Sequence, residues 1–480
     1  MDEKEKQTPS LLEPESIGGD IADSGFAFQT NLILCKIPYW LSFEGFSAVI
    51  REATGDIEAK FYVPGEGEGI EAVEAKNHSL TPAKFWAEIE RFKKMDEGSP
   101  GTFRHFTLCC SGISEEIKTV VNALRRLRDS QPFYESSSGV MQHSMEAYKE
   151  RVRKLGKSDE IADFLYQKVL IESDWYLHSD EKTKGLFQSQ LIEHHPMYED
   201  LSVKELNNVY IALHNLVRTH KARPITRLQI EQTIQSAISE RNRLTSHPII
   251  LFTEIEPSKR ERKELHFKWT PFFGGAEREY PSSKEWNEGL MRDLQETRDW
   301  IIKNRSTRHI LLKDNRRISS AIAIGSVFSA VSGFVVEIDY RGERWATNDH
   351  PTAETPLYPL STEFQKGDDN HLVVTVGIMK DHVMSEVNEY LRQANLSQLS
   401  MLHLTSREPI LSPKHANVAV EAIKKEIKNT LGVCRTKCIH LFYAGPSHLA
   451  LFLGHRWNAL APVQCYEWTH TGMYTPTCLI

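Results

Sequence analysis

The strongest constraint on the fold is a regular alternation of short apolar runs with helical stretches in the second half of the chain. Apolar runs rich in β-branched residues occur at 309–313, 334–339, 371–378, 400–405, 438–443 and 463–468. Stretches of helical character lie between them, at 319–331, 383–394, 417–431 and from Ser447 onward. Strands that alternate with helices predict a parallel sheet in an α/β fold. The pattern starts again at His371, which predicts two related units side by side.

The first half of the chain has a different organisation. Residues up to Cys110 predict a helix followed by several strands, and from Glu115 to Asn242 apolar residues recur at helical spacing. Turn residues and a charged run after Thr245 predict a boundary. A chain of 480 residues is long enough for several domains. We therefore expect a first domain at residues 1–242, with a helical extension, and a second at residues 243–480.

Three residues in the first domain indicate a catalytic site. Asp56 follows a glycine at the start of a predicted strand, and Glu74 and Lys76 lie two residues apart on the next one. Side chains alternate along a strand, so Glu74 and Lys76 project from the same face. Two carboxylates can bind a hard cation such as Mg²⁺, and a nearby lysine can orient or deprotonate a water. The pattern favours phosphodiester hydrolysis, although a solvated strand edge with an ion pair has the same residues.

The order of a helix, a strand with Asp56 and a strand with Glu74 and Lys76 resembles the core of the PD-(D/E)xK superfamily of restriction-type endonucleases. Gly55 stands where that family usually has proline. The resemblance implies an α/β/α core that cuts double-stranded DNA, with Asp56 and Glu74 as ligands of Mg²⁺ or Mn²⁺ and Lys76 as a catalytic residue. Gln29, on the preceding helix, matches the position of a helix-borne Glu or Gln and is a further catalytic candidate.

The second domain carries residues suited to binding phosphates and bases. A small-residue turn at 444–447 leaves a strand and enters a helix, where glycine permits close approach and the helix start attracts phosphate. Basic side chains after another strand can pair with phosphates, and aromatic residues near strand ends can stack on bases. Ser447 can also be only a helix cap, and some of the aromatic residues can belong to the core. The candidate ligand-binding residues are Lys313, Arg316, Arg317, Trp345, Gly445, Pro446, Ser447, Tyr466 and Trp468.

Two segments of this domain resemble the SAVED family. Ile439–His455 followed by Ala461–Trp468 is similar to the end of that domain, where a strand, a turn with Pro-Ser, a helix and a strand with aromatic residues follow one another. Lys313–Gly325 has a strand, a basic turn and a helix in the matching order. The resemblance runs from about Trp269 to Ile480. It implies two fused CARF-like, Rossmann-like units that bind a cyclic oligonucleotide.

A restriction-type nuclease joined to a SAVED domain is the architecture of effector endonucleases of bacterial CBASS anti-phage defence, of the Cap-four type, and the chain resembles that family in both halves. The resemblance implies a DNA endonuclease that a cyclic di- or trinucleotide activates by causing homo-oligomerisation, with indiscriminate DNA degradation. The alternative is a cyclic-nucleotide sensor whose N-terminal domain binds DNA or a partner without cutting.

Composition excludes several other classes. The net charge of −7 is not that of a basic nucleic-acid binder. No apolar run of about 18 residues predicts a membrane span, and the polar N-terminus does not resemble a signal peptide, so we expect a cytoplasmic protein. The seven cysteines mostly occur in apolar runs and are expected to be free thiols. Cys434 and Cys438 have a spacing seen in zinc sites, but no second pair matches it, so zinc is not expected.

Overall fold

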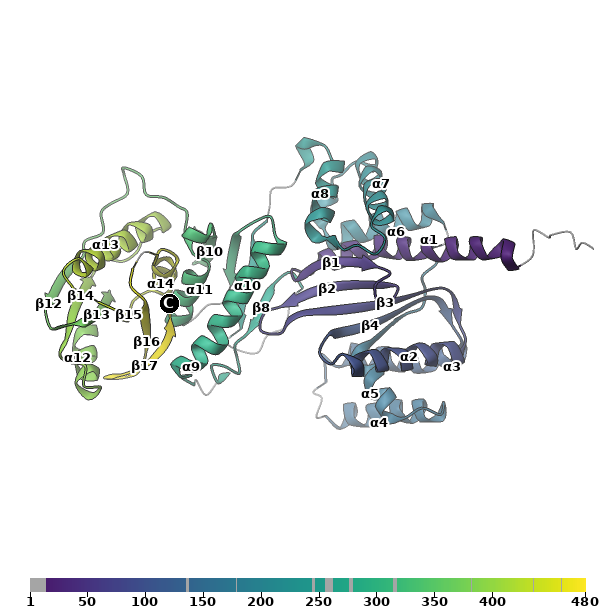
Figure 1. Ribbon diagram of the computed structural model, residues 1–480, viewed down its shortest axis with the longest axis horizontal. Helices are drawn as coiled ribbons and strands as arrows, with labels where there is room; N and C mark the ends of the chain where they lie inside the picture. Colours follow the sequence, from purple (N-terminus) through teal and green to yellow (C-terminus); the bar gives the residue numbers. More distant parts are fainter. Residues whose placement is uncertain are drawn as a thin grey trace, which may run out of the picture. The chain divides into compact units, whose positions relative to one another are not determined.

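The computed structural model describes residues 14–134, 138–177, 179–243, 247–254, 262–275, 279–313, 317–380, 382–434, 436–458 and 460–480 (Figure 1). They form two compact units. Unit 1 comprises the described residues within Met1–Tyr62 and Glu68–Leu244, and unit 2 those within Val63–Gly67 and Thr245–Ile480. The division after Leu244 lies close to the boundary expected from the sequence, after Asn242.

Unit 1 is built on one sheet with the strand order β5-β4-β3-β2-β1-β6. The strands are β1 Phe46–Arg51, β2 Ile57–Val63, β3 Gly67–Leu80, β4 Phe103–Ile113, β5 Val169–Glu172 and β6 Ile225–Thr226. β2 and β3 are neighbours joined by a short turn and therefore form a hairpin, whereas β3, β4 and β5 run parallel. The hairpin matters most for the site because Asp56 directly precedes β2 and Glu74 lies within β3.

Helices cover both faces of this sheet (Figure 1). On one face are α1 Pro14–Leu41, α6 Asp180–His194, α7 Val203–Thr219 and α8 Arg227–Ala237, and on the other are α2 Pro82–Gly98, α3 Glu115–Ser130, α4 Gly139–Lys154 and α5 Asp159–Lys168. Val73 and Cys109 belong to the first buried layer, and Ala72 and Leu108 to the second. The alternation of side chains along β3 and β4 thus supplies both cores. Short 3-10 turns occur at Pro196–Tyr198 and Glu240–Asn242.

Unit 2 contains two sheets, of which the first has the order β11-β10-β9-β7-β8. Its strands are β7 Ile249–Glu254, β8 Leu265–Lys268, β9 His309–Lys313, β10 Val335–Tyr340 and β11 Glu343–Ala346. They run parallel except in the β10–β11 hairpin. The helices of this half are α9 Ser283–Glu285, a π-helical turn at Trp286–Leu290, α10 Met291–Asn304, α11 Ile318–Val327 and a 3-10 turn at Ala330–Ser332.

The second sheet of unit 2 has the order β12-β14-β13-β15-β16-β17. Its strands are β12 Ser361–Gln365, β13 Asp368–Ile378, β14 Leu399–Ser406, β15 Cys438–Ala444, β16 Val463–His470 and β17 Met473–Leu479, and its helices are α12 Val383–Gln393, α13 Pro413–Leu431 and α14 Ser447–His455. The four central strands are parallel, and the two edge strands are antiparallel to their neighbours. α12 packs on the face that bears Val373 and Phe442.

The predicted α/β class is confirmed. All six predicted apolar strands of the second half are present as β9, β10, β13, β14, β15 and β16, and the helices between them are α11, α12, α13 and α14. The restart of the pattern at His371 corresponds to the second sheet. Five strands lie outside the predicted set, namely β7, β8, β11, β12 and β17. In the part of the chain that the structure describes, no helix combines the length and apolar character that crossing a membrane requires.

α11 and α14 touch at a pair of glycines. A Cβ added at Gly325 would overlap the carbonyl oxygen of Leu451, and one added at Gly454 would overlap the carbonyl oxygen of Ile322. Glycine is therefore what allows the two helix backbones to approach so closely. Because α11 follows a strand of the first sheet and α14 follows a strand of the second, this contact connects the two halves of unit 2.

Alanine at either glycine should destabilise unit 2. We expect Gly325→Ala and Gly454→Ala each to lower its free energy of unfolding by about 1–3 kcal/mol, the usual cost of overpacking. Denaturant unfolding of the full-length chain measures this. Gly289→Ala is the matched control, because its Cβ would meet the Phe272 ring at 3.8 Å, an ordinary contact. Wild-type stability in both variants would contradict the role given to this contact.

Candidate functional site

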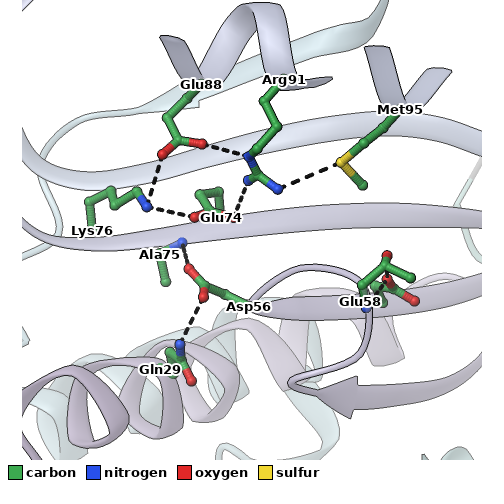
Figure 2. A network of polar contacts seen from close by, with 10 residues as sticks. Gln29, Asp56, Glu58, Glu74, Ala75, Lys76, Glu88, Arg91 and Met95 are labelled. Carbon is green, nitrogen blue, oxygen red and sulfur yellow. Dashed lines mark hydrogen bonds and ion pairs between the residues drawn. The ribbon is translucent and has the colours of Figure 1, made fainter. Parts of the chain in front are cut away.

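The structure brings the four predicted catalytic residues together around the β2–β3 hairpin (Figure 2). The Asp56 carboxylate accepts a hydrogen bond from the side-chain amide of Gln29, on α1, at 2.9 Å. Its other oxygen accepts one from the backbone N–H of Ala75, on β3, at 2.8 Å. These two bonds fix Asp56 next to the residue that separates Glu74 from Lys76. The four residues, three predicted from their order and spacing and Gln29 from the PD-(D/E)xK resemblance, thus lie together.

Glu74 and Lys76 lie in a closed network of charges with two residues of α2 (Figure 2). Glu74 is 7% exposed and forms ion pairs with Lys76, at 2.6 Å, and with Arg91. Lys76 also pairs with Glu88 at 2.9 Å, and Glu88 with Arg91 at 2.9 Å. We call Glu74, Lys76, Glu88 and Arg91 the charge network. Each carboxylate in it lies between two cations.

Glu88 and Arg91 are site residues that were not predicted from the sequence. Their spacing of three residues places both on one face of α2, which is also typical of an ordinary helix ion pair. Nothing in the local sequence indicates that this face lies over β3 beside Glu74. The only available signal was an acid–base pair on the first helix after the strand with Glu74 and Lys76.

Burial and neighbouring charges shift the ionisation of this site. Burial, and then the nearby carboxylate of Glu74, raise the pKa of Asp56 to about 6, although the N–H of Ala75 acts in the opposite direction. Burial alone would lower the pKa of Lys76, but its hydrogen bonds to Glu74 and Glu88 outweigh this and raise it. Lys76 is therefore a cation at neutral pH. Two adjacent carboxylates oppose each other's ionisation, and a bound divalent cation relieves that repulsion.

The raised pKa of Asp56 gives unit 1 a defined dependence of stability on pH. The folded-state value of about 6 lies above the ordinary aspartate value of 3.8. The folded state therefore binds the proton more tightly, and this stabilisation is complete below pH 3.8 and is lost as the pH rises through about 6. We expect the wild type to lose thermal stability relative to Asp56→Asn as the pH rises from 3.8 to about 6 in EDTA, and to lose no more above that range. A relative gain over this interval would contradict the assignment, and Glu58→Gln should follow the wild type.

In unit 2, the turn at 444–447 lies at the carboxyl end of β15 and leads into α14. A Cβ at Gly445 would lie 2.8 Å from the hydroxyl of Tyr443 and 3.0 Å from Cβ of Ile378, so the turn requires glycine. The carbonyl oxygen of Pro446 accepts a hydrogen bond from the Tyr443 hydroxyl at 2.9 Å. Ser447 is the first residue of α14 and is half-buried. The hydrogen bond from Tyr443 thus fixes the conformation of the turn.

Trp345 lies beside the start of α14. It is 3% exposed, and its ring meets that of His448, the second residue of α14, with centroids 4.8 Å apart. Tyr340 packs on the same histidine at 4.3 Å. The structure therefore brings Trp345, from the first sheet of unit 2, next to the turn with Gly445, Pro446 and Ser447, from the second sheet.

The predicted basic residues have other partners. Lys313 ends β9, and its partly exposed ammonium group pairs with the buried Glu264 at 2.7 Å. Arg317 is 7% exposed, lies over the Phe273 ring at 4.3 Å and pairs with Glu467 of β16 at 3.5 Å. Arg316 lies outside the described residues. Arg317 thus takes part in the packing between the two sheets, whereas Lys313 reaches the surface.

The two predicted aromatic residues of β16 differ in their surroundings. Tyr466 is buried beneath α12, where its ring stacks on Phe442 with centroids 4.3 Å apart. Its hydroxyl is hydrogen-bonded to Nδ1 of His440 at 2.8 Å. Trp468 is 47% exposed and presents its indole ring to solvent. Of the two, Trp468 is the more accessible for stacking on a base.

Comparisons with known proteins match the sensor half to a named family and nearly the whole chain to named relatives. Residues 293–480 match the family model of the SMODS-associated and fused to various effectors sensor domain, SAVED. Over 473 residues, 98% of each chain, the protein is 29% identical to CD-NTase-associated protein 4 of Moraxella osloensis. It is also 29% identical over 474 residues to a protein of that name from an Acinetobacter species, again with 98% of each chain covered.

A solved structure shows the same architecture. The Acinetobacter baumannii Cap4 SAVED/CARF-domain receptor, determined with the cyclic trinucleotide 2'3'3'-cAAA, matches with a TM-score of 0.80 and 26% identity, over 95% of this chain and 98% of that one. Residues 293–480 therefore match the SAVED sensor domain, and the chain also contains the α/β unit that bears the charge network. The predicted resemblance to CBASS effectors of the Cap-four type is confirmed, and the chain is similar to Cap4 proteins over nearly its whole length.

Proposed function

We propose that the chain is a metal-dependent endonuclease for double-stranded DNA that acts in the cytoplasm and is activated by a cyclic trinucleotide bound in unit 2. The convergence of Gln29, Asp56, Glu74 and Lys76 carries this proposal. Asp56 before β2, Glu74 and Lys76 on β3, and the Gln29 amide on α1 are the set that the PD-(D/E)xK resemblance implies.

These side chains fit a hard divalent cation, Mg²⁺ or Mn²⁺. Asp56 and Glu74 would hold it, since such cations prefer carboxylate oxygens. Burial, and then the nearby carboxylate of Glu74, raise the pKa of Asp56, and the second of these causes supports a shared cation. In addition, Oε1 of Gln29 is buried without a hydrogen-bond partner within the described part of the chain. When bound, such a cation supplies Lewis-acid activation of the phosphodiester and of a water.

Lys76 acts as a cation in this proposal rather than as a base. The carboxylates of Glu74 and Glu88 hold its proton, so it can orient a water or neutralise a phosphate charge. The charge network also favours the alternative, a domain that binds DNA or a partner without cutting. Lys76 and Arg91 already neutralise Glu74, as in a purely structural ion-pair network. Activity measurements separate the two functions.

A cyclic trinucleotide is the activating ligand that the comparisons favour. The A. baumannii receptor was solved with such a molecule, and the SAVED match covers the corresponding part of this chain. The turn with Gly445, Pro446 and Ser447 offers backbone N–H groups at the start of α14, which suit a phosphate. We further propose that the ligand drives homo-oligomerisation, because one site cuts one strand and cleavage of a duplex favours several copies acting together.

Conservative variants of the carboxylates test the enzyme. With Mg²⁺ and 2'3'3'-cAAA, the wild type should degrade plasmid DNA, and Asp56→Asn and Glu74→Gln should remove this activity. Lys76→Met should lower the rate by about 10²–10³-fold, the usual cost of losing one electrostatic stabiliser. Glu58→Gln is the matched control, because Glu58 lies next to the site and is hydrogen-bonded to Thr54 instead.

All of these variants should still bind the cyclic trinucleotide, since the metal ligands are in unit 1. Cleavage by Glu74→Gln at the wild-type rate would rule out the assigned metal site. Ligand-dependent assembly on DNA with no cleavage by the wild type would establish the alternative function. Light scattering shows whether assembly accompanies activation, and a ligand-saturated active monomer would refute the oligomeric switch.

Lys313 provides a test of the ligand site. A charge-assisted contact contributes roughly 1.5–3 kcal/mol, so Lys313→Ala should weaken binding of 2'3'3'-cAAA by about 10- to 100-fold in titration calorimetry. The substitution also leaves the buried Glu264 without its partner. The double variant Lys313→Ala/Glu264→Gln removes that unpaired charge. If Lys313 contacts the ligand, both variants bind weakly, and if the double variant binds like the wild type, the role of Lys313 is only to pair with Glu264.

A further inference from the structure

Three metal-ligating side chains that the proposed function does not use lie together on the second sheet of unit 2. His371 is on β13, and Cys438 and His440 are on β15. Each offers one ligand atom, and these atoms all lie within 4.8 Å of one another. Nδ1 of His371 and Nε2 of His440 are 2.9 Å apart. All three side chains are partly exposed, so an ion can reach them from solvent.

Strand register explains this cluster. His371 pairs with Cys438 across the parallel strands β13 and β15, and His440 follows Cys438 by two residues and therefore projects from the same face. On the other side of β13, the register with β14 shifts between Asp368 and Leu372. Such irregularities re-aim side chains at a strand end. The cluster lies at the amino ends of β13 and β15, whereas the turn at 444–447 lies at the opposite end of β15.

The separation of the nitrogens fits a tetrahedral cation after a small adjustment. Zn²⁺ binds histidine nitrogen at about 2.0–2.1 Å and cysteine sulfur at about 2.3 Å, so two nitrogens in a tetrahedral site are roughly 3.3 Å apart. The imidazole nitrogens of His371 and His440 need to open by only about 0.4 Å, which small ring rotations provide. In the protein without metal, the same two nitrogens share one hydrogen-bonded proton.

A hydrogen bond beyond the cluster orients His440. Its Nδ1 is bonded to the hydroxyl of Tyr466 at 2.8 Å. Histidine ligands of metals commonly use the other ring nitrogen for such a bond, which fixes the orientation of the ring. When Nε2 of His440 binds a cation, Nδ1–H donates to the Tyr466 oxygen, and the thiol of Cys438 releases its proton to solvent.

We propose that His371, Cys438 and His440 form a Zn²⁺ site that ties β13 to β15 and leaves a fourth position for water. Nitrogen and sulfur donors favour zinc over Mg²⁺, which requires oxygen. The inference is independent of the proposed nuclease function, because none of the three residues belongs to unit 1. In this site the partners of Cys438 are two histidines, whereas its spacing in the sequence suggested Cys434 as a partner.

The full-length chain, stripped with EDTA and returned to buffer with excess Mg²⁺, should take up one Zn²⁺ in titration calorimetry. Co²⁺ in place of Zn²⁺ should give the charge-transfer band of a cobalt–thiolate bond and visible bands typical of tetrahedral coordination. Tyr466→Phe should weaken Zn²⁺ binding by roughly 10- to 100-fold, and Cys438→Ser and His440→Gln should weaken it further. Cys434→Ser is the matched control for loss of a thiol and should bind like the wild type.

Thermal unfolding separates loss of the site from loss of the fold. Without metal, Cys438→Ser should unfold at nearly the wild-type temperature. Zn²⁺ should raise the unfolding temperature of the wild type and of Cys434→Ser, but not that of Cys438→Ser. A wild type that takes up no stoichiometric Zn²⁺ would overturn the proposal. Equal uptake by the wild type, Cys438→Ser and His440→Gln would also overturn it, because it would show that the ion binds elsewhere.

Discussion

The contact between α11 and α14 is the constraint on which the architecture of the sensor unit depends. At Gly325 and Gly454 the two helices meet backbone to backbone, and this contact joins the two halves of unit 2 that carry its two sheets. Two polar contacts also connect the two halves of unit 2. Arg317 pairs with Glu467, and His455 is hydrogen-bonded to the carbonyl oxygen of Phe334 at 3.0 Å. Trp345, from the first sheet, also crosses this boundary and packs at the start of α14. A ligand at that turn would therefore contact residues of both sheets.

The two candidate cation sites differ in the chemistry of their donors. The site at Asp56 and Glu74 offers carboxylate oxygens, with the amide oxygen of Gln29 beside them. The cluster of His371, Cys438 and His440 offers nitrogen and sulfur. Hard cations such as Mg²⁺ prefer oxygen donors, and borderline cations such as Zn²⁺ prefer nitrogen and sulfur donors. The donors of the first site would therefore favour Mg²⁺ or Mn²⁺, and those of the second would favour Zn²⁺.

Strands with apolar, β-branched sequences could be predicted because burial on both faces leaves a continuous apolar run. β12 could not, since all five of its residues are exposed and its only support is pairing with β14. β17 contains Pro476, which argues against a strand, but β17 lies at the sheet edge, where proline is tolerated. Local sequence carries no information on such edge pairing.

Sequence order placed Asp56, Glu74 and Lys76 in one site, because the two strands of a hairpin are close in the chain, and the PD-(D/E)xK resemblance added Gln29 on the preceding helix. The sequence could not place Glu88 and Arg91, because tertiary packing decides which face of α2 lies over Glu74. It could not place the His371–Cys438–His440 cluster either, because packing decides which strands are neighbours. The sensor candidates show the same limit. The turn at 444–447 was predicted from local residues, whereas the pairing of Arg317 with Glu467 joins positions far apart in the chain.

The hydrogen bond from the Ala75 N–H to Asp56 forms only when β3 is paired in the correct register. A slip of β3 by one residue would turn Glu74 and Lys76 to the opposite face and would remove this bond at the same time. A newly synthesised chain whose hairpin has paired incorrectly therefore lacks the complete set of side chains. For the endonuclease proposed above, correct folding would then be a condition of toxicity, and misfolded copies would be harmless to the cell that makes them.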